Sequence, residues 1–330
     1  MLIEISESSQ TGEARRRAVE YAEELDFDEA RRGAVAIATT EMASNLVKHA
    51  GKGSILLQSI HVGDHPTLRV MAVDRGPGIA DVKKAMIDGH STAGSMGTGL
   101  GAIRRLSDSF EIYSGPQVGT VIRADFCALS SRSGKEPALI EVGAVSEPIV
   151  GEKVCGDGWG SRPLRGAMLM LVVDGLGHGV LAHEAAQEAK RVLAETRSVE
   201  PHNIVHDVHA ALKKTRGAAM AIAKLDLDNR VLKFAGVGNI SASIVSAGSS
   251  RGLPSHNGTL GQVASRVQEF TYPWNAEDVL IMHSDGLATR WNLQQYPGIW
   301  SKHPSIIAAI LHRDFSRHRD DVTVFVAKTL

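Results

Sequence analysis

Apolar residues recur at two different spacings along the first part of the chain. Over residues 13–25 and 28–49 they fall three and four positions apart, which predicts two helices, the second capped by Asp28. Over residues 54–62 and 68–73 they alternate or run together, which predicts strands. Two short helices at 81–88 and 100–107 and two strands at 110–113 and 120–126 complete this part. The pattern is that of a mixed α+β domain.

The second part of the chain is richer in predicted strands. Apolar runs predict strands at 139–145, 167–173, 217–227, 231–236, 241–246, 279–283 and 322–327. Helical spacing is found at 180–197, 201–214 and 305–315. Asp228, Asn229 and Arg230 form a predicted hairpin turn. The polar stretch 130–137, which contains glycine and proline and has no periodicity, predicts a linker between domains at 1–129 and 138–330.

Length and composition fit this two-domain organisation. The chain has 330 residues, 43% of them hydrophobic and 22% charged, with a net charge of −1. This balance indicates neither a nucleic-acid-binding nor a membrane-binding surface, and no apolar run has the length of a membrane span. Two cysteines cannot build a disulfide framework, and the acidic N-terminus is unlike a secretory signal. We therefore expect a cytoplasmic protein.

Three features of the first domain carry candidate chemistry. Glu41 and Asn45 stand four apart, so they share one helical face. Asp74 opens the stretch DRGPG at a predicted strand end, and the stretch MGTGLG, residues 96–101, precedes a predicted helix. Glycines there let backbone N–H groups approach phosphate oxygens. Each feature alone is usually a solvated helix face, a turn or a flexible loop. Together, in this order, they indicate a nucleotide site with an acid and an amide beside it.

These motifs resemble the GHKL ATPase family, in the branch of RsbT-type anti-sigma-factor serine kinases. EMASN is similar to the N box, DRGPGI to the first glycine box and GTGLG to the second, and the likeness covers residues 1–127. The resemblance implies a GHKL-type α/β sandwich that binds ATP and Mg²⁺. The cofactor-binding residues it implies are Asn45, Asp74, Gly76, Gly78, Gly97, Gly99, Gly101 and Thr120.

The resemblance also implies a role for each residue. Asn45 would coordinate Mg²⁺, and Glu41 would be the base that activates a protein serine hydroxyl. Asp74 would accept a hydrogen bond from the adenine amine, and Gly78 would give the base room. The glycines of the second box would lie against the phosphates, beneath a lid at residues 89–95. The chain has neither a catalytic-loop HRD nor a Walker lysine, which excludes the eukaryotic-kinase and P-loop classes.

Four acidic sites of the second domain lie beside predicted strands. They are Asp157, Asp174 in DGLGHG, Asp285 in SDG, and the pair Asp320-Asp321. An Asp-Gly pair alone is usually a turn. Several converging carboxylates suit Mg²⁺ or Mn²⁺, and two such ions about 4 Å apart can clamp a phosphoryl group and ionise a bridging water. Gly175 has no side chain, so its carbonyl could reach a metal.

This second pattern resembles the metal-dependent serine/threonine phosphatases of the PPM superfamily, in the SpoIIE-like branch of RsbX type, over residues 138–330. The resemblance implies an αββα sandwich with two Mn²⁺ or Mg²⁺ ions held by Asp157, Asp174, the Gly175 carbonyl, Asp285 and Asp320. Asp157 and Asp174 would be catalytic through those ions. Asp320 is preferred to Asp321 as the ligand, because the first acid of this motif is the metal ligand in the family. Many relatives place another acid shortly after Asp157, where this chain has GWG.

Two further features accompany these acids in the sequence. His178 is either a proton donor to the leaving serine or a local hydrogen-bonding group, and the second is favoured. The pair Gly238-Asn239 resembles a structural turn that lies near the site in the family.

The two resemblances together imply one chain with opposed activities. The first domain would phosphorylate, and the second dephosphorylate, serine or threonine on STAS-domain proteins of the anti-anti-sigma or stressosome type. Such partner switching extends to a downstream phosphatase or sigma-factor regulator, with no nucleic acid and no membrane involved. One alternative is an ATP-binding module that sequesters a partner without phosphotransfer, fused to an active phosphatase. Another is a scaffold in which both domains are degenerate.

Overall fold

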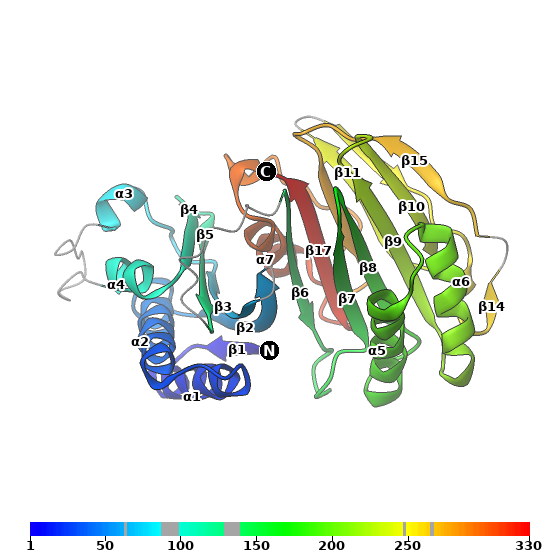
Figure 1. The fold of residues 1–330 in the computed structure, drawn as a ribbon. Coiled ribbons are helices and arrows are strands. Elements are labelled where there is room, and N and C mark those ends of the chain that lie inside the picture. The colour runs from blue at the N-terminus through cyan, green and yellow to red at the C-terminus, as the bar shows by residue number, and fades with distance from the viewer. Residues whose placement is uncertain (63–64, 87–98, 129–138, 247–248, 265–266) are drawn as a thin grey trace. The chain divides into compact units, whose positions relative to one another are not determined.

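The computed structural model describes residues 1–62, 65–86, 99–128, 139–246, 249–264 and 267–330. The chain divides into two compact units (Figure 1). Unit 1 comprises residues 1–138 together with 293–313, and unit 2 comprises 139–292 together with 314–330. A segment from late in the chain therefore belongs to the unit built by its beginning.

Unit 1 contains a five-stranded antiparallel sheet in the order β1-β2-β3-β5-β4. Its strands are β1 (Leu2–Ile5), β2 (Gly53–Val62), β3 (His65–Asp74), β4 (Ser109–Gly115) and β5 (Gly119–Cys127). Its helices are α1 (Ser8–Glu24), α2 (Glu29–Asn45), which continues as the π-helical turn η1 (Leu46–Ala50), α3 (Val82–Ala85) and α4 (Gly99–Leu106). The segment 293–313 adds the 3₁₀ turn η3 (Ile299–Ser301) and all but the last two residues of α7 (Pro304–Phe315).

One face of this sheet packs against helices. Leu68, Val70 and Ala72 alternate along β3 and lie in the same buried cluster as residues of α1 and α2. The buried positions of α1 are all alanines, which lets the helix approach closely. Alternation along a strand sends the residues between them to the opposite face.

The opposite face carries buried charges. Arg69 donates two hydrogen bonds to the carboxylate of Asp125, at 2.8 and 2.9 Å, and both side chains are almost fully buried. Arg69 also donates to the hydroxyl of Ser305 in the segment 293–313. All nine residues of β5 are buried, although only alternate ones face the helices. Burial would raise the pKa of Asp125, but the charges of Arg69 and Arg123 lower it below its ordinary value.

Removing this carboxylate charge should destabilise unit 1 strongly. In Asp125→Asn the Arg69 guanidinium stays buried without its counter-charge, an arrangement that costs about 3–5 kcal/mol. We expect the midpoint of urea unfolding to fall accordingly. Asp26→Asn is the matched control, because Asp26 is exposed and its φ of 57° suits asparagine. Equal midpoints for the two variants would contradict the expectation.

Unit 2 contains two five-stranded sheets, in the orders β15-β10-β9-β8-β7 and β12-β11-β16-β17-β6. The strands of the first are β7 (Asp157–Leu164), β8 (Ala167–Gly175), β9 (Ala218–Asp226), β10 (Val231–Val237) and β15 (Phe270–Pro273). Those of the second are β6 (Ile140–Glu147), β11 (Ser241–Ser246), β12 (Ser249–Leu253), β16 (Val279–His283) and β17 (Val322–Thr329). A short pair, β13 (Gly258–Thr259) and β14 (Val263–Ala264), lies apart. The helices are α5 (Val180–Glu195), α6 (Pro201–Ala211) and the 3₁₀ turn η2 (Leu212–Lys214).

The strand β8 shows how unit 2 is layered. Met170 and Val172 join a buried cluster that includes residues of both sheets. Leu169, Leu171 and Val173 join another cluster with α5 and α6. The central strands are therefore apolar on both faces, with helices on one side and the second sheet on the other, as Figure 1 shows for this unit.

Most predicted elements are confirmed, and the differences have local causes. Asp28 caps α2 by accepting the N–H of Arg31 at 2.7 Å, as predicted. The helix α1 begins at Ser8 rather than at residue 13, because Glu7 and Gln10 form a capping box. The strand β7 was not predicted, because its glycines and Pro163 are atypical of strands. It forms an edge of its sheet, where proline is tolerated. No helix of the described residues is long and apolar enough to cross a membrane.

Candidate functional site

The first candidate site begins where β3 ends. Asp74 pairs with Thr120 of β5, and its Oδ1 accepts the backbone N–H groups of Gly76 at 2.7 Å and Thr120 at 3.1 Å. Burial raises the pKa of Asp74 above its ordinary value, and these two hydrogen bonds act against the rise. The protein thus fixes the orientation of a half-buried carboxylate at the strand end.

The turn after Asp74 lies tightly against the β4–β5 hairpin. Gly78 has a φ of +76°, and a Cβ there would lie 1.9 Å from the carbonyl oxygen of Gly115, so no other residue fits. The hydroxyl of Ser114 accepts the N–H of Ile79 at 2.8 Å and lies 2.8 Å from the hydroxyl of Thr120. The predicted residues Asp74, Gly76, Gly78 and Thr120 therefore lie together.

Glu41 and Asn45 lie on the last turn of α2, opposite the start of α4. A Cβ on Gly99 would lie 2.9 Å from Oε2 of Glu41 and 3.7 Å from Nδ2 of Asn45. Gly101 is buried in the first turn of α4. An acid, an amide and the N–H groups of a helix start thus lie side by side, which suits a phosphate and a cation. Gly97 and the predicted lid at 89–95 lie outside the described residues.

The second candidate site lies at the joined ends of β7 and β8. Asp157 and Asp174 are direct partners across this strand pair. The amide Nδ2 of Asn239 donates to Oδ2 of Asp174 at 3.2 Å and to Oδ2 of Asp285 at 2.8 Å. The buried hydroxyl of Ser284 donates to Asp157 at 2.5 Å. Three of the predicted acids thus converge, and the amide NH₂ of Asn239 donates to two of them.

Burial and mutual repulsion perturb these acids. Burial, and next the charge of Asp174, raise the pKa of Asp157 well above its ordinary value. Burial, and next the charge of Asp285, raise the pKa of Asp174 to about 7. Among the described residues, no group of three or more His, Cys, Asp or Glu side chains is arranged so that it could hold a metal ion. The chemistry of the donors nevertheless suits a divalent cation, because the carboxylates supply only oxygen and their charges repel one another.

The neighbouring pair Asp320-Asp321 divides between two environments. Asp321 is buried and accepts the N–H groups of Ile149 at 2.7 Å and Gly156 at 2.8 Å, one on each oxygen. Asp320 is exposed and accepts the N–H of Asp321 at 2.9 Å. Asp321 therefore anchors the loop that leads to Asp157, a role that sequence reasoning missed.

Three further positions contribute to this site. Gly175 is buried, and a Cβ there would lie 2.1 Å from the carbonyl oxygen of Ala182, so the first turn of α5 can approach β8 only over glycine. Ser284, which fixes Asp157, was also missed, although it stands in the SDG motif. Asn239 was interpreted as part of a turn; its side chain contacts two acids.

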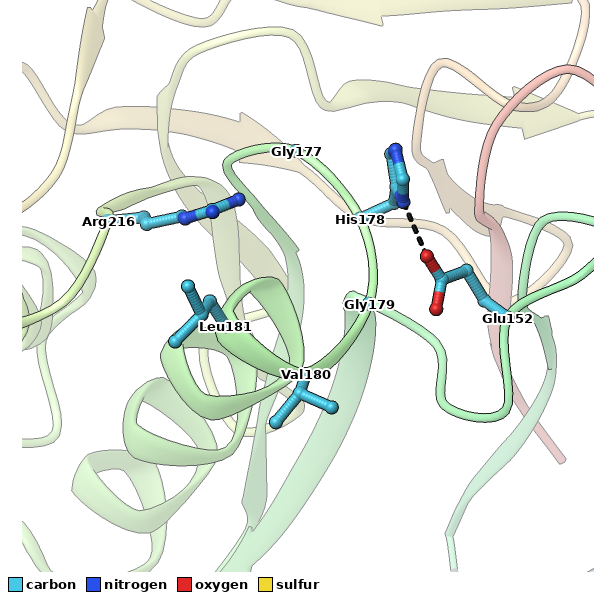
Figure 2. Close-up of a pocket in the computed structure, with 7 residues that line it drawn as sticks. All are labelled: Glu152, Gly177, His178, Gly179, Val180, Leu181 and Arg216. Atoms are coloured by element: carbon cyan, nitrogen blue, oxygen red, sulfur yellow. Dashed lines mark hydrogen bonds and ion pairs between the residues drawn. The ribbon is translucent and has the colours of Figure 1, made fainter.

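A pocket of about 460 Å³ opens beside the loop after Asp174. Figure 2 shows it lined by Gly177, His178 and Gly179 of that loop, Val180 and Leu181 of α5, and Glu152 and Arg216. His178 points to Glu152, with Nδ1 of the imidazole 2.7 Å from the carboxylate Oε1. This contact is the local hydrogen bond favoured from the sequence. Val180 and Leu181 are large apolar side chains left exposed.

Two family models match the chain. Residues 6–126 match the histidine kinase-like ATPase domain, and residues 165–330 match the stage II sporulation protein E (SpoIIE) family. Over 111 residues the chain is 38% identical to the serine/threonine-protein kinase RsbT of Bacillus subtilis (strain 168), covering 34% of this chain and 84% of RsbT. Over 138 residues it is 27% identical to the phosphoserine phosphatase RsbX of the same organism, covering 42% of this chain and 69% of RsbX.

Two solved structures are also similar to the chain. A chain described in work on the bacterial stressosome aligns with a TM-score of 0.54 and 27% identity, covering 57% of this chain and 99% of its own. RsbX in complex with magnesium aligns with a TM-score of 0.51 and 24% identity, covering 59% of this chain and 98% of its own. The latter likeness is one of fold.

Proposed function

The chain belongs to the SpoIIE family and also carries an RsbT-homologous histidine kinase-like ATPase domain, and we propose that it both adds and removes phosphate on one class of partner protein. One observation carries this proposal. The Glu41–Asn45 pair lies against a helix start in unit 1, while a separate carboxylate cluster around Asp157 and Asp174 lies in unit 2. Each set matches one half of a phosphorylation cycle.

The first set suits phosphotransfer from ATP. In our proposal Asp74 accepts a hydrogen bond from the adenine amine, and Gly76 and Gly78 leave room for the base beside Thr120. Gly99 and Gly101 lie against the phosphates. Asn45 holds Mg²⁺, which neutralises phosphate charge when bound. Glu41 takes the proton of a serine or threonine hydroxyl on the partner protein. The oxygen of that hydroxyl forms a bond to the γ-phosphorus of ATP as the bond from this phosphorus to ADP breaks.

The second set suits hydrolysis of the resulting phosphoester. Asp157, Asp174, Asp285, Asp320 and the Gly175 carbonyl would hold two Mg²⁺ or Mn²⁺ ions. When bound, these ions neutralise the phosphoryl oxygens and acidify the attacking water. Ser284 and Asn239 orient the ligand carboxylates, and Asp321 holds the preceding loop. The support for Asp320 is that both oxygens of Asp321 already accept backbone N–H groups.

We propose a STAS-domain protein of the anti-anti-sigma or stressosome type as the substrate of both halves. RsbT and RsbX are named a serine/threonine-protein kinase and a phosphoserine phosphatase, and a stressosome-related structure is among the similar ones. The exposed Val180 and Leu181, with Arg216 across the pocket, suit a protein surface that carries a phosphate better than a small metabolite.

The test follows phosphate on the partner. The full chain is incubated with STAS-domain proteins encoded near it, once with ATP and Mg²⁺ and once with Mn²⁺ and phosphorylated partner but no ATP. Mass spectrometry should show one serine or threonine gaining phosphate in the first reaction and losing it in the second. If no STAS protein changes in either reaction, the proposed partner class is wrong.

The raised pKa of Asp174 predicts how pH and metal affect stability. A carboxyl that titrates near pH 7 when folded, but near pH 4 when unfolded, stabilises the fold fully below about pH 4, and this contribution is lost as pH rises through about 7. In EDTA, melting temperatures should therefore fall over this range. Mn²⁺ at about 100 times its dissociation constant should add about 2.7 kcal/mol to the free energy of unfolding.

The matched control for this prediction is Asp174→Asn, which removes one of the two carboxyls with a raised pKa and should reduce the pH dependence measured in EDTA. A Mn²⁺ effect as large in Asp174→Asn as in the original chain would contradict the assignment of Asp174 as a ligand.

A further inference from the structure

The segment 293–313 covers the outer face of the unit 1 sheet, although its sequence lies within the SpoIIE-family match. Its backbone N–H at His303 donates to Oε2 of Glu111 at 3.0 Å. The hydroxyl of Tyr113 donates to the carbonyl of Pro297 at 3.2 Å. Together with the Arg69–Ser305 contact, these hydrogen bonds join the segment to both β4 and β3.

The last contact of this segment reaches the nucleotide site itself. Nη1 of Arg313 donates to the backbone carbonyl of Asp74 at 2.6 Å, and Arg75 in turn donates to the carbonyl of Arg313. The residue whose carboxylate we assign to the adenine amine is therefore held, through its own peptide, by the phosphatase half of the chain.

The surrounding backbone makes room for this contact. Gly119 has a φ of +76°, and a Cβ there would lie 2.1 Å from the carbonyl oxygen of Asp74 and 2.8 Å from Nη1 of Arg313. A side chain at 119 would displace one partner or the other. The guanidinium also places a positive charge near the Asp74 carboxylate and acts against the rise of its pKa, which favours the acceptor form.

We propose that Arg313 is a positioning residue of the ATP site, so that adenine recognition by the first domain depends on a residue supplied by the second half of the chain. This inference rests on the proposed function, since it takes Asp74 as the adenine-reading residue. Arg313 acts on the peptide of Asp74 and on its charge rather than on the nucleotide. Its loss should therefore weaken recognition of the base and leave phosphate binding in place.

The test measures nucleotide binding to the full chain with ATP and with inosine triphosphate, which lacks the 6-amino group. In Arg313→Ala the Kd for ATP should rise about tenfold, the worth of one charge-assisted hydrogen bond. The Kd for inosine triphosphate should change much less, so the preference for ATP shrinks. Arg313→Lys keeps the charge and one donor, and should retain part of the preference. Arg290→Ala, at an exposed arginine, is the control.

The outcomes separate this inference from the function on which it rests. If the unaltered chain binds neither nucleotide, the proposed ATP site is wrong and the inference falls with it. If the unaltered chain prefers ATP and Arg313→Ala keeps that preference, the inference alone is overturned. An equal loss of affinity for both nucleotides would mean that Arg313 only supports the fold. So would a loss of affinity in Arg313→Lys that is accompanied by unfolding. Either result also overturns the inference.

Discussion

Asp174→Asn should lower phosphatase turnover on the order of 10³-fold while making the metal-depleted protein more stable. Asparagine keeps the shape of the side chain but removes one charge from the cluster that we propose holds divalent ions. Those ions supply several kcal/mol of transition-state stabilisation, and each 1.36 kcal/mol is a factor of ten. In EDTA the same change relieves repulsion from Asp285. Burial is the largest cause of the raised pKa of Asp174, and the charge of Asp285 is the second largest.

These opposite signs distinguish a site residue from a structural one. A structural aspartate, when neutralised, loses stability and activity together, whereas here stability in EDTA should rise as turnover falls. Turnover is measured on a phosphorylated STAS protein with Mn²⁺, and stability by thermal unfolding. Asp228→Asn, on the exposed β9–β10 hairpin of the same unit, should change neither. If Asp174→Asn retained its turnover, Asp174 would not be a catalytic residue of the phosphatase.

Glu41→Gln should abolish phosphotransfer while ATP still binds. Loss of a general base costs about 10²- to 10⁴-fold in rate. Glutamine keeps the size of the side chain that lies beside Gly99, but it cannot take up the serine proton. The Kd for ATP should stay within a few fold, since Asp74 and the glycine turn are untouched. Labelled phosphate transfer and nucleotide titration on the same preparation give both numbers.

This variant also decides between a kinase and a sequestering module. If the original chain binds ATP and partner but transfers no phosphate, the sequestering alternative is correct. If it transfers phosphate and Glu41→Gln transfers it equally well, the base is another residue. Glu13→Gln, at an exposed glutamate of α1, controls for the loss of a charge and should leave both measurements unchanged.

Local chemistry explains why part of each site could be predicted. The spacing of Glu41 and Asn45 and the glycine turn after Asp74 are set by neighbours within a few residues, so sequence pattern reveals them. The same holds for the acids that end strands. Ser284 and Asp321 could not be predicted, because their partners at Asp157 and Gly156 are more than a hundred residues away in the chain. Pattern carries no information about such pairs.

The organisation of the two units was the least predictable feature. Nothing in the apolar spacing of 305–315 distinguishes a helix that covers its own domain's sheet from one that covers another. The signal that existed lay in β5, whose polar residues Arg123 and Asp125 alternate with apolar ones like those of a solvent-facing strand. Their burial follows only once the segment 293–313 is known to belong to unit 1.

That shared segment limits how this protein can be divided for experiments. A fragment ending at residue 138 would expose the face that holds Arg69, Arg123 and Asp125, and would lose Arg313 from the peptide of Asp74. A fragment beginning at residue 139 would carry the apolar stretch 306–311 without the sheet it accompanies in unit 1. We therefore expect neither fragment to fold as it does in the full chain. A fusion that joins residues 293–313 through a linker to residues 1–138 would be the appropriate way to isolate unit 1.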